Sequence, residues 1–178
     1  MIDTPFRGQE LDACVVDALA QPGASPSHIL ALISDRLQSD WGIKLVTVTQ
    51  RDISDGSFMR LYSSMPDAYA AAGRKPPNET PWTGHVIEEQ KTFLANDYNE
   101  LAAAMYDHEQ IKALGCESIV NVPIVVAGAV IGTLNCLAGP GHFDSDAVGA
   151  CEAMRLPVAT ALLLFAQQTS AQGPERFI

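Results

Sequence analysis

Positive charge is scarce in this 178-residue chain: 11 Lys and Arg stand against 21 Asp and Glu, for a formal net charge of −10. No cluster of Lys and Arg interrupts the acidic balance, and negative charge repels a phosphate backbone. Nucleic acid is therefore disfavoured as a partner. With 47% hydrophobic and 18% charged residues, the composition is that of a folded domain rather than a disordered chain.

The sequence also lacks a signal segment and a long apolar run. Its opening, MIDTPFRGQELDA, has no basic stretch followed by an apolar core. The longest apolar run, LPVATALLLFA, is about half as long as a membrane span. We therefore expect a cytoplasmic protein with no membrane partner, whose four cysteines are reduced.

Metal-binding motifs are missing as well, because the sequence contains no CxxC, HxxxH or HExxH. These spacings place ligands around zinc in known structural and catalytic sites. No zinc site is expected.

Hydrophobic periodicity predicts two helices at the start of the chain. Apolar residues recur at helical spacing from Leu11 to Leu19, and the pattern stops at Pro22-Gly23. A second helix is expected from Pro26, with Ser25 as its N-cap. The period then changes to two, which is typical of strands. The remaining elements are expected in this order: a hairpin (43–50 and 57–64), a covering loop (65–81), a short helix (81–92), a short strand (93–97), a helix ending at Gly115, a second hairpin (118–126 and 129–137) turning at Ala127-Gly128, and a long helix that Pro157 kinks or splits.

Residue parity gives each predicted strand one apolar face and one face with polar groups, because alternate side chains point to opposite sides of a sheet. In the second hairpin the polar set contains Asn121, Thr133 and Asn135. In 58–62 the corresponding set contains Phe58, Arg60 and Tyr62. Antiparallel hairpins interrupted by helices predict an α+β domain with helices packed on one sheet face. The smooth apolar faces are expected to pack on the terminal helices.

Three motifs of the second half resemble those of the GAF domain family. The first is W-x-G-x-V-I-E-x-x-K-x-F-L-x-x-D at 82–97, and the second is G-x-x-S-I-V-N-V-P-I-V-V-x-G-x-V-I-G-T-L-N at 115–135. The third is F-D-x-D at 143–146. The resemblance covers about residues 10–168. It implies a terminal helix and turn (1–24) that belong to the helical layer, a GAF domain (25–168) and a disordered tail (169–178).

The resemblance also implies a ligand pocket, between one sheet face and the covering helices and loops. If the polar strand faces share that side, Arg60, Tyr62, Asn121, Thr133 and Asn135 converge in it. Arg60 could bind a carboxylate or phosphate at two points, and the asparagines could read donors and acceptors. Trp82 and His85, three residues apart on one helix, are expected at its border. The alternative is that these polar groups satisfy the covering loop or face water.

GAF domains differ widely in function, so the resemblance leaves several functions open. A sensory or regulatory binder of a small polar or anionic molecule is the first. Thiol chemistry like that of the free methionine-R-sulfoxide reductases is the second. Its catalytic residue is unknown, and Cys116 is the one cysteine expected to be accessible, since Cys136, Cys14 and Cys151 fall on apolar faces. Haem bound through His85 or His108 is the third.

We expect no attached kinase, cyclase or DNA-binding domain, so a signal is expected to pass through a partner or a dimer. GAF domains commonly dimerise through their terminal helices. The segment VATALLLFAQQ is apolar on more than one face. We therefore expect a homodimer.

Overall fold

The computed structural model describes residues 6–71, 74–76 and 79–171. Within them the helices and strands follow in this order: α1 (Phe6–Ala20), α2 (Pro26–Trp41), β1 (Leu45–Arg51), β2 (Phe58–Ser63), β3 (Arg74–Lys75), α3 (Pro81–Thr83), the π-helical turn η1 (Gly84–Glu88), β4 (Phe93–Ala95), α4 (Tyr98–Ala104), α5 (His108–Ala113), β5 (Ser118–Val126), β6 (Ala129–Ala138), α6 (Ser145–Ala153) and α7 (Arg155–Ala171).

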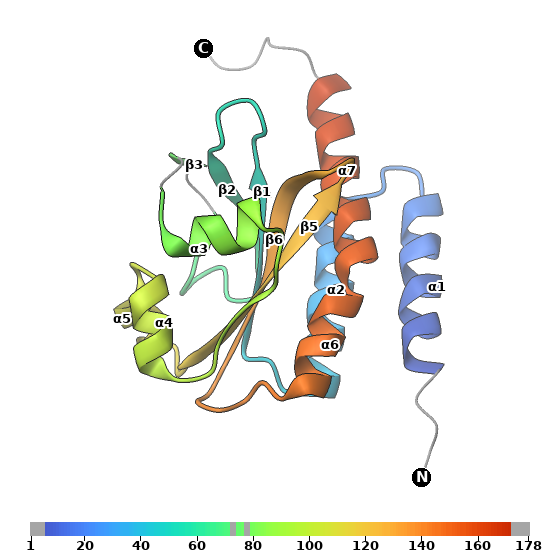
Figure 1. Ribbon diagram of the computed structural model, residues 1–178. Coiled ribbons are helices and arrows are strands. Elements are labelled where there is room, and N and C mark those ends of the chain that lie inside the picture. Colours follow the sequence, from blue (N-terminus) through green and yellow to red (C-terminus); the bar gives the residue numbers. More distant parts are fainter. Residues whose placement is uncertain (1–5, 72–73, 77–78, 172–178) are drawn as a thin grey trace.

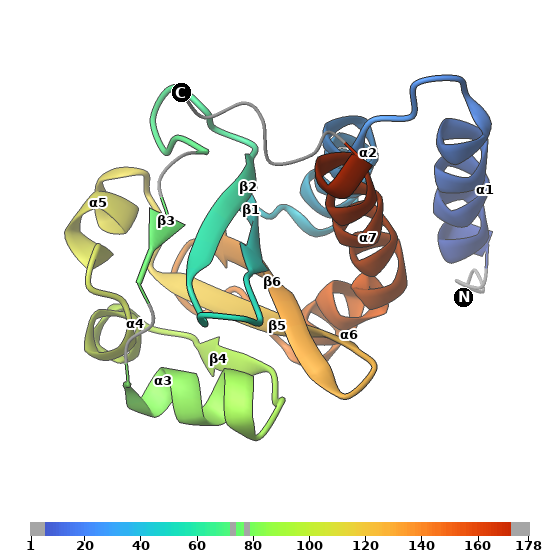
Figure 2. The ribbon, with the colours of Figure 1, turned by 90° about the horizontal axis from the view of Figure 1, so that it is seen from above.

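One antiparallel sheet forms the middle layer, and in the described residues its strand order is β3-β2-β1-β6-β5-β4. Helices α2, α6 and α7 cover one face, and α1 packs on the outer side of α2 (Figure 1). Helices α3, α4 and α5 lie over the opposite face (Figure 2). The predicted α+β class, with terminal helices on one face of an antiparallel sheet, is confirmed.

The main hydrophobic core lies between the sheet and the terminal helices. Val120, Val122 and Ile124 of β5 and Leu134 of β6 alternate along their strands and are buried there. They meet buried residues of α2 and α7 such as Ile29, which all belong to the same cluster. Parity therefore predicted the apolar face of this hairpin. Its turn is also as expected, since Ala127 and Gly128 both have positive φ, as the tightest hairpin turns require.

A β-bulge between β1 and β2 changes which side chains share a face. Val48 pairs with Tyr62 and Thr49 pairs with Arg60, so Leu61 is an extra residue in β2. Arg60 keeps the face opposite the terminal helices. Tyr62 instead lies beside Val48 and packs against the helix-covered core. The expectation that Tyr62 shares a face with Arg60 is corrected by this bulge.

Two predicted helices are each broken into two. The helix expected to end at Gly115 is interrupted at Met105–Asp107, where Met105 has extended backbone angles. Local helix propensity is weak beside tertiary contacts, and this turn packs over the sheet. The last helix is split at Met154, and Pro157 falls in the first turn of α7, where proline is tolerated. Residues 169–171, expected in the tail, belong to α7, and 172–178 lie outside the described residues.

By length and composition, the stretch Ser145–Ala171 could cross a membrane. In the structure this stretch is two helices, and Val158, Ala161 and Leu162 are buried in the main core. Core helices of folded domains pass the same test of composition, so the stretch is weak evidence for a span.

Gly132 of β6 allows α7 to approach the sheet closely, and this contact generates a prediction. A Cβ atom at this position would lie 2.3 Å from the Thr49 carbonyl oxygen and 2.7 Å from Leu162 Cδ1. Gly132→Ala should therefore lower the free energy of unfolding by roughly 1–3 kcal/mol, measured by urea denaturation.

Gly149→Ala is the matched control, because Gly149 lies in α6 and an added Cβ meets no atom within 4 Å. This variant should be as stable as the parent or more stable by up to about 1 kcal/mol. Equal stability of Gly132→Ala and the parent would contradict the close approach of α7.

Candidate functional site

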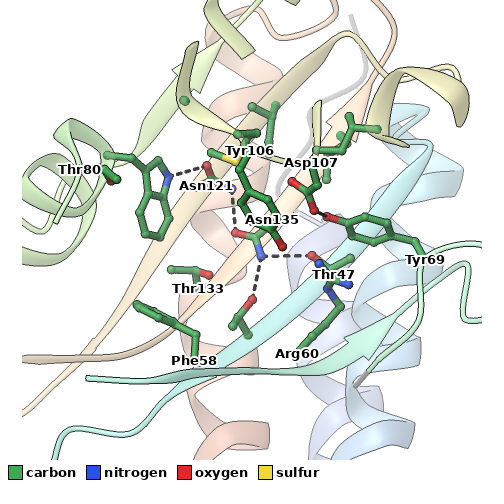
Figure 3. A pocket seen from close by; sticks show the side chains of 17 residues that line it. Thr47, Phe58, Arg60, Tyr69, Thr80, Tyr106, Asp107, Asn121, Thr133 and Asn135 are labelled. Atoms are coloured by element: carbon green, nitrogen blue, oxygen red, sulfur yellow. Dashed lines mark hydrogen bonds between the residues drawn. The ribbon is translucent and has the colours of Figure 1, made fainter. Parts of the chain in front are cut away.

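The face of the sheet that the terminal helices leave uncovered forms the floor of a cavity of about 170 Å³. Helix α3, the turn between α4 and α5, and the segment after β2 surround it (Figure 3). The loop predicted at 65–81 contributes Tyr69 and Thr80 to its walls. This volume is below the roughly 300–1,000 Å³ of sites for drug-sized ligands. It suits a small molecule.

Polar side chains from three adjacent strands line the floor because they occupy alternate positions that face the same way. Asn121 of β5 is directly opposite Asn135 of β6. Asn135 is in turn opposite Thr47 of β1, and Thr133 is opposite Thr49. All five line the cavity.

Hydrogen bonds join four of these side chains and Trp82 into one chain, drawn as dashed lines in Figure 3. Trp82 Nε1 donates to Asn121 Oδ1 at 2.9 Å, and Asn121 Nδ2 donates to Asn135 Oδ1 at 2.7 Å. Asn135 Nδ2 donates to the hydroxyl oxygens of Thr47 and Thr49 at 3.1 and 3.2 Å. We call this series the amide relay. It holds α3 to the floor without any ligand.

Two charged residues, Arg60 and Asp107, lie with Tyr69 at one end of the cavity. The Arg60 guanidinium carbon is 3.8 Å from the centroid of the Tyr69 ring, and Arg60 Nη1 donates to the Ala70 carbonyl at 2.9 Å. The Tyr69 hydroxyl donates to Asp107 Oδ2 at 2.5 Å. Burial, followed by this bond to Asp107, raises the pKa of Tyr69 well above its ordinary value. Tyr69 is therefore a neutral hydrogen-bond donor at physiological pH.

Aromatic side chains also line the cavity, and of these Phe58 lies away from Tyr69 and Asp107 (Figure 3). The rings of Phe58 and Trp82 meet edge to face, with centroids 6.2 Å apart. Tyr106, in the turn between α4 and α5, also lines the cavity although 73% of it is exposed, which puts it at the mouth. The cavity thus has an aromatic end, a polar floor and a charged end.

The structure brings most of the predicted site residues together. Arg60, Trp82, Asn121, Thr133 and Asn135 all line the cavity, and their role in binding stays a prediction. Tyr62 does not line it, because of the bulge in β2.

His85 lies outside the cavity, in a neighbouring surface hollow, where its Nε2 is 3.0 Å from the Thr92 carbonyl oxygen. In an α-helix, residues three positions apart lie on the same face. Trp82 belongs to α3, but His85 belongs to the π-helical turn η1, whose wider repeat directs its side chain elsewhere.

Sequence reasoning missed Thr47, Thr49, Tyr69, Tyr106 and Asp107. The two threonines carried a signal, since they alternate with apolar residues in LVTVTQ. Phe58 belonged to the same parity set as Arg60 and does line the cavity. Tyr69 and Asp107 carried none, because one lies in an aperiodic loop and the other in a break that no local pattern marks.

The structure corrects the expectation about the cysteines. Cys116 is fully buried, and burial raises the pKa of its thiol although the nearby Lys44 lowers it in part. Cys14, expected on a buried stripe, is exposed. Cys136 and Cys151 are buried in the main core, where their mutual hydrogen bond and burial raise the pKa of Cys136. No cysteine lines the cavity among the described residues.

The residues present do not fit axial haem ligation in this cavity, because neither candidate imidazole borders it. His108 Nδ1 is 2.9 Å from the Tyr98 hydroxyl. The described part of the chain also contains no group of three or more His, Cys, Asp or Glu side chains that could hold a metal ion.

A comparison with protein-family models decides the family, since the model described as "GAF domain" matches residues 23–162. The chain belongs to the GAF domain family. This confirms the resemblance seen in the sequence motifs. A search of curated proteins gave no significant match.

Solved structures share the fold at low sequence identity. A GAF domain from a phosphoenolpyruvate-protein phosphotransferase of Coxiella burnetii is 15% identical with a TM-score of 0.66, covering 95% of this chain and 99% of that one. The GAF domain of a two-component sensor histidine kinase from Bacillus halodurans is 12% identical (TM-score 0.65, coverage 80% and 96%). The chromophore-binding domain of a bacteriophytochrome from R. palustris is 11% identical (TM-score 0.63, coverage 93% and 64%).

The amide relay predicts a stability effect at Asn121. Asn121→Leu removes the acceptor of the Trp82 indole and the donor to Asn135 Oδ1. A buried polar group left without a partner costs roughly 1–3 kcal/mol. Urea denaturation should therefore show a fall of about that size in the free energy of unfolding.

Two comparisons separate the relay from a general effect of the substitution. Asn99→Leu, at an exposed position of α4, should change stability by less than about 0.5 kcal/mol. In a Trp82→Phe background, Asn121→Leu should be less destabilising by at least about 0.5 kcal/mol, because the indole donor is already gone. Additive effects of the two substitutions would contradict the relay.

Proposed function

We propose that this GAF domain is a sensory or regulatory module that binds one small polar molecule in the cavity, with Arg60 holding an anionic group of that molecule. The observation that carries the proposal is the cavity itself, which places a guanidinium at one end of a prearranged polar floor. Five N–H donors in a planar fork make guanidinium well suited to a carboxylate or phosphate.

A sensory role is supported by the similar folds of domains from a sensor histidine kinase and a bacteriophytochrome. Binding is favoured over thiol chemistry, because the described lining of the cavity contains no cysteine. We also propose that the protein is cytoplasmic, which agrees with its unpaired cysteines.

Arg60 is the residue on which the proposal depends most. In a thermal-denaturation screen of carboxylates, phosphates and amino acids, a ligand present at 100 times its Kd should raise Tm by about 5–10 °C. Arg60→Ala should weaken the binding of that ligand by roughly 10–100-fold, since hydrogen bonds to charged groups contribute about 1.5–3 kcal/mol.

Arg36→Ala is the control, because Arg36 pairs with Asp40 on α2, on the opposite side of the sheet. This variant should respond to the same ligand as the parent does. A ligand that stabilises the parent and Arg60→Ala to the same extent would show that binding does not use this cavity.

The second part of the proposal concerns a partner copy of the chain. Leu156 and Leu163 on α7 are 73% and 49% exposed, and their spacing of seven residues places them on one helix face. We propose that this face pairs with a second copy to form a homodimer.

The dimer predicts a change of mass in solution. Light scattering at micromolar concentration should give twice the mass of one chain for the parent. Leu156→Glu combined with Leu163→Glu should give the mass of a monomer, because each charge would be buried at the interface. Leu94→Glu, at an exposed position of β4, should remain a dimer. A monomeric parent protein would rule the dimer out.

A further inference from the structure

The charges that line the cavity are of both signs, which bears on what it can bind. Among the described lining residues, Arg60 and Asp107 are the two that carry a formal charge. They contact the same phenol: the Arg60 guanidinium lies over the Tyr69 ring, and Asp107 accepts a hydrogen bond from the Tyr69 hydroxyl. Positive and negative charge are therefore neighbours at one end of the cavity (Figure 3).

Both charged groups retain capacity for a ligand. Among the described residues, Arg60 donates from Nη1 to the Ala70 carbonyl and Asp107 accepts at Oδ2 from the Tyr69 hydroxyl. Asp107 precedes α5 without capping it through its side chain. A ligand with a single negative charge would meet Arg60 but be repelled by Asp107. A ligand with a single positive charge would meet the reverse problem. A molecule whose positive and negative groups are close together can bind both residues at once.

The floor offers one more polar contact. Thr133 is 2% exposed and lines the cavity, so its hydroxyl can meet a polar atom of a bound molecule. The amides beside it are already joined in the relay, which leaves them little freedom to reorganise around a ligand.

The rest of the cavity is apolar. Phe58 and Trp82 form its aromatic end, and Met105, Ile119 and Leu137 add aliphatic surface. Such a surface takes up a hydrocarbon group more readily than a sugar or a second charge. The volume of about 170 Å³ also favours one compact molecule.

We propose that the ligand is a zwitterion, an α-amino acid with an apolar side chain, whose carboxylate binds Arg60 and whose ammonium group binds Asp107. Its side chain lies against the rings of Phe58 and Trp82. In an α-amino acid the ammonium and carboxylate groups are attached to one carbon. This matches two charged residues, Arg60 and Asp107, that contact one phenol. This inference rests on the proposed function, because it names the ligand class of the same cavity.

Isothermal titration with L-leucine and three matched compounds tests the proposal. 6-Aminohexanoate is an isomer of leucine with its charges at opposite ends, 4-methylpentanoate lacks the ammonium group, and leucinamide lacks the carboxylate. L-Leucine should bind at least tenfold more tightly than these three compounds. If L-methionine or L-phenylalanine is the better ligand, the same difference is expected between it and its own matched compounds. Arg60→Gln and Asp107→Asn should each raise the Kd of the amino acid at least tenfold.

The Asp107→Asn variant gives the sharpest contrast, because asparagine can still accept a hydrogen bond from the Tyr69 hydroxyl but no longer repels an anion. It should bind 4-methylpentanoate more tightly than the parent does, while binding L-leucine more weakly. Thermal denaturation of each variant without ligand checks that it is folded. If Asp107 has a purely structural role, the substitution should weaken the binding of both compounds to the same extent.

Failure of this inference can be distinguished from failure of the proposed function. If 4-methylpentanoate binds the parent as tightly as L-leucine and requires Arg60, the zwitterion is wrong and the anion-binding cavity stands. If none of the three amino acids binds at millimolar concentration, the ligand class is also wrong. If L-leucine binds equally to the parent and to Arg60→Gln, both proposals fall.

Discussion

The hydrogen bond between Asn121 and Asn135 is the interaction on which the uncovered face of the sheet depends. Two primary amides face each other across β5 and β6 in a region where each unpaired group would cost about 1–3 kcal/mol. Their pairing extends to the Trp82 indole on one side and to two threonine hydroxyls on the other. A polar floor can therefore exist under a cover of helices, and α3 is fixed above it.

This polar face is possible because the other face of the sheet supplies the apolar packing. The strands bury valine, isoleucine and leucine against α2 and α7, and Gly132 lets α7 lie close to the sheet. A smaller apolar cluster around Leu101 and Ile111 holds α4 and α5 at the edge of the cavity. The turn between these two helices is then free to carry Tyr106 and Asp107 to the cavity rather than to continue a helix.

Much of this arrangement could be predicted from the sequence where the strands are regular. Period-two alternation placed Asn121, Thr133 and Asn135 on one face, and the structure agrees. The same rule failed at Tyr62 because one extra residue in β2 reverses the alternation, and no residue type in FMRLYS marks a bulge. The rule that residues three positions apart share a helix face failed at His85. It assumes an α-helix, and His85 lies in a π-helical turn.

Two residues at the charged end of the cavity, Tyr69 and Asp107, could not be predicted from the sequence, for a different reason. Tyr69 and Asp107 are 38 positions apart, one in an aperiodic loop and the other in a helix break. Their contact follows from tertiary packing, which no local pattern encodes. Recognition of the family gave the location of a pocket but could not give its chemistry, because GAF domains share a fold more than a ligand.

Native mass measurement on protein purified from its own host tests the central claim most directly, since it requires no prior choice of ligand. We expect the parent protein to carry the added mass of one small molecule, and Arg60→Ala purified in the same way to have lost it. An added mass that stays unchanged in Arg60→Ala would contradict the assignment of this cavity as the binding site.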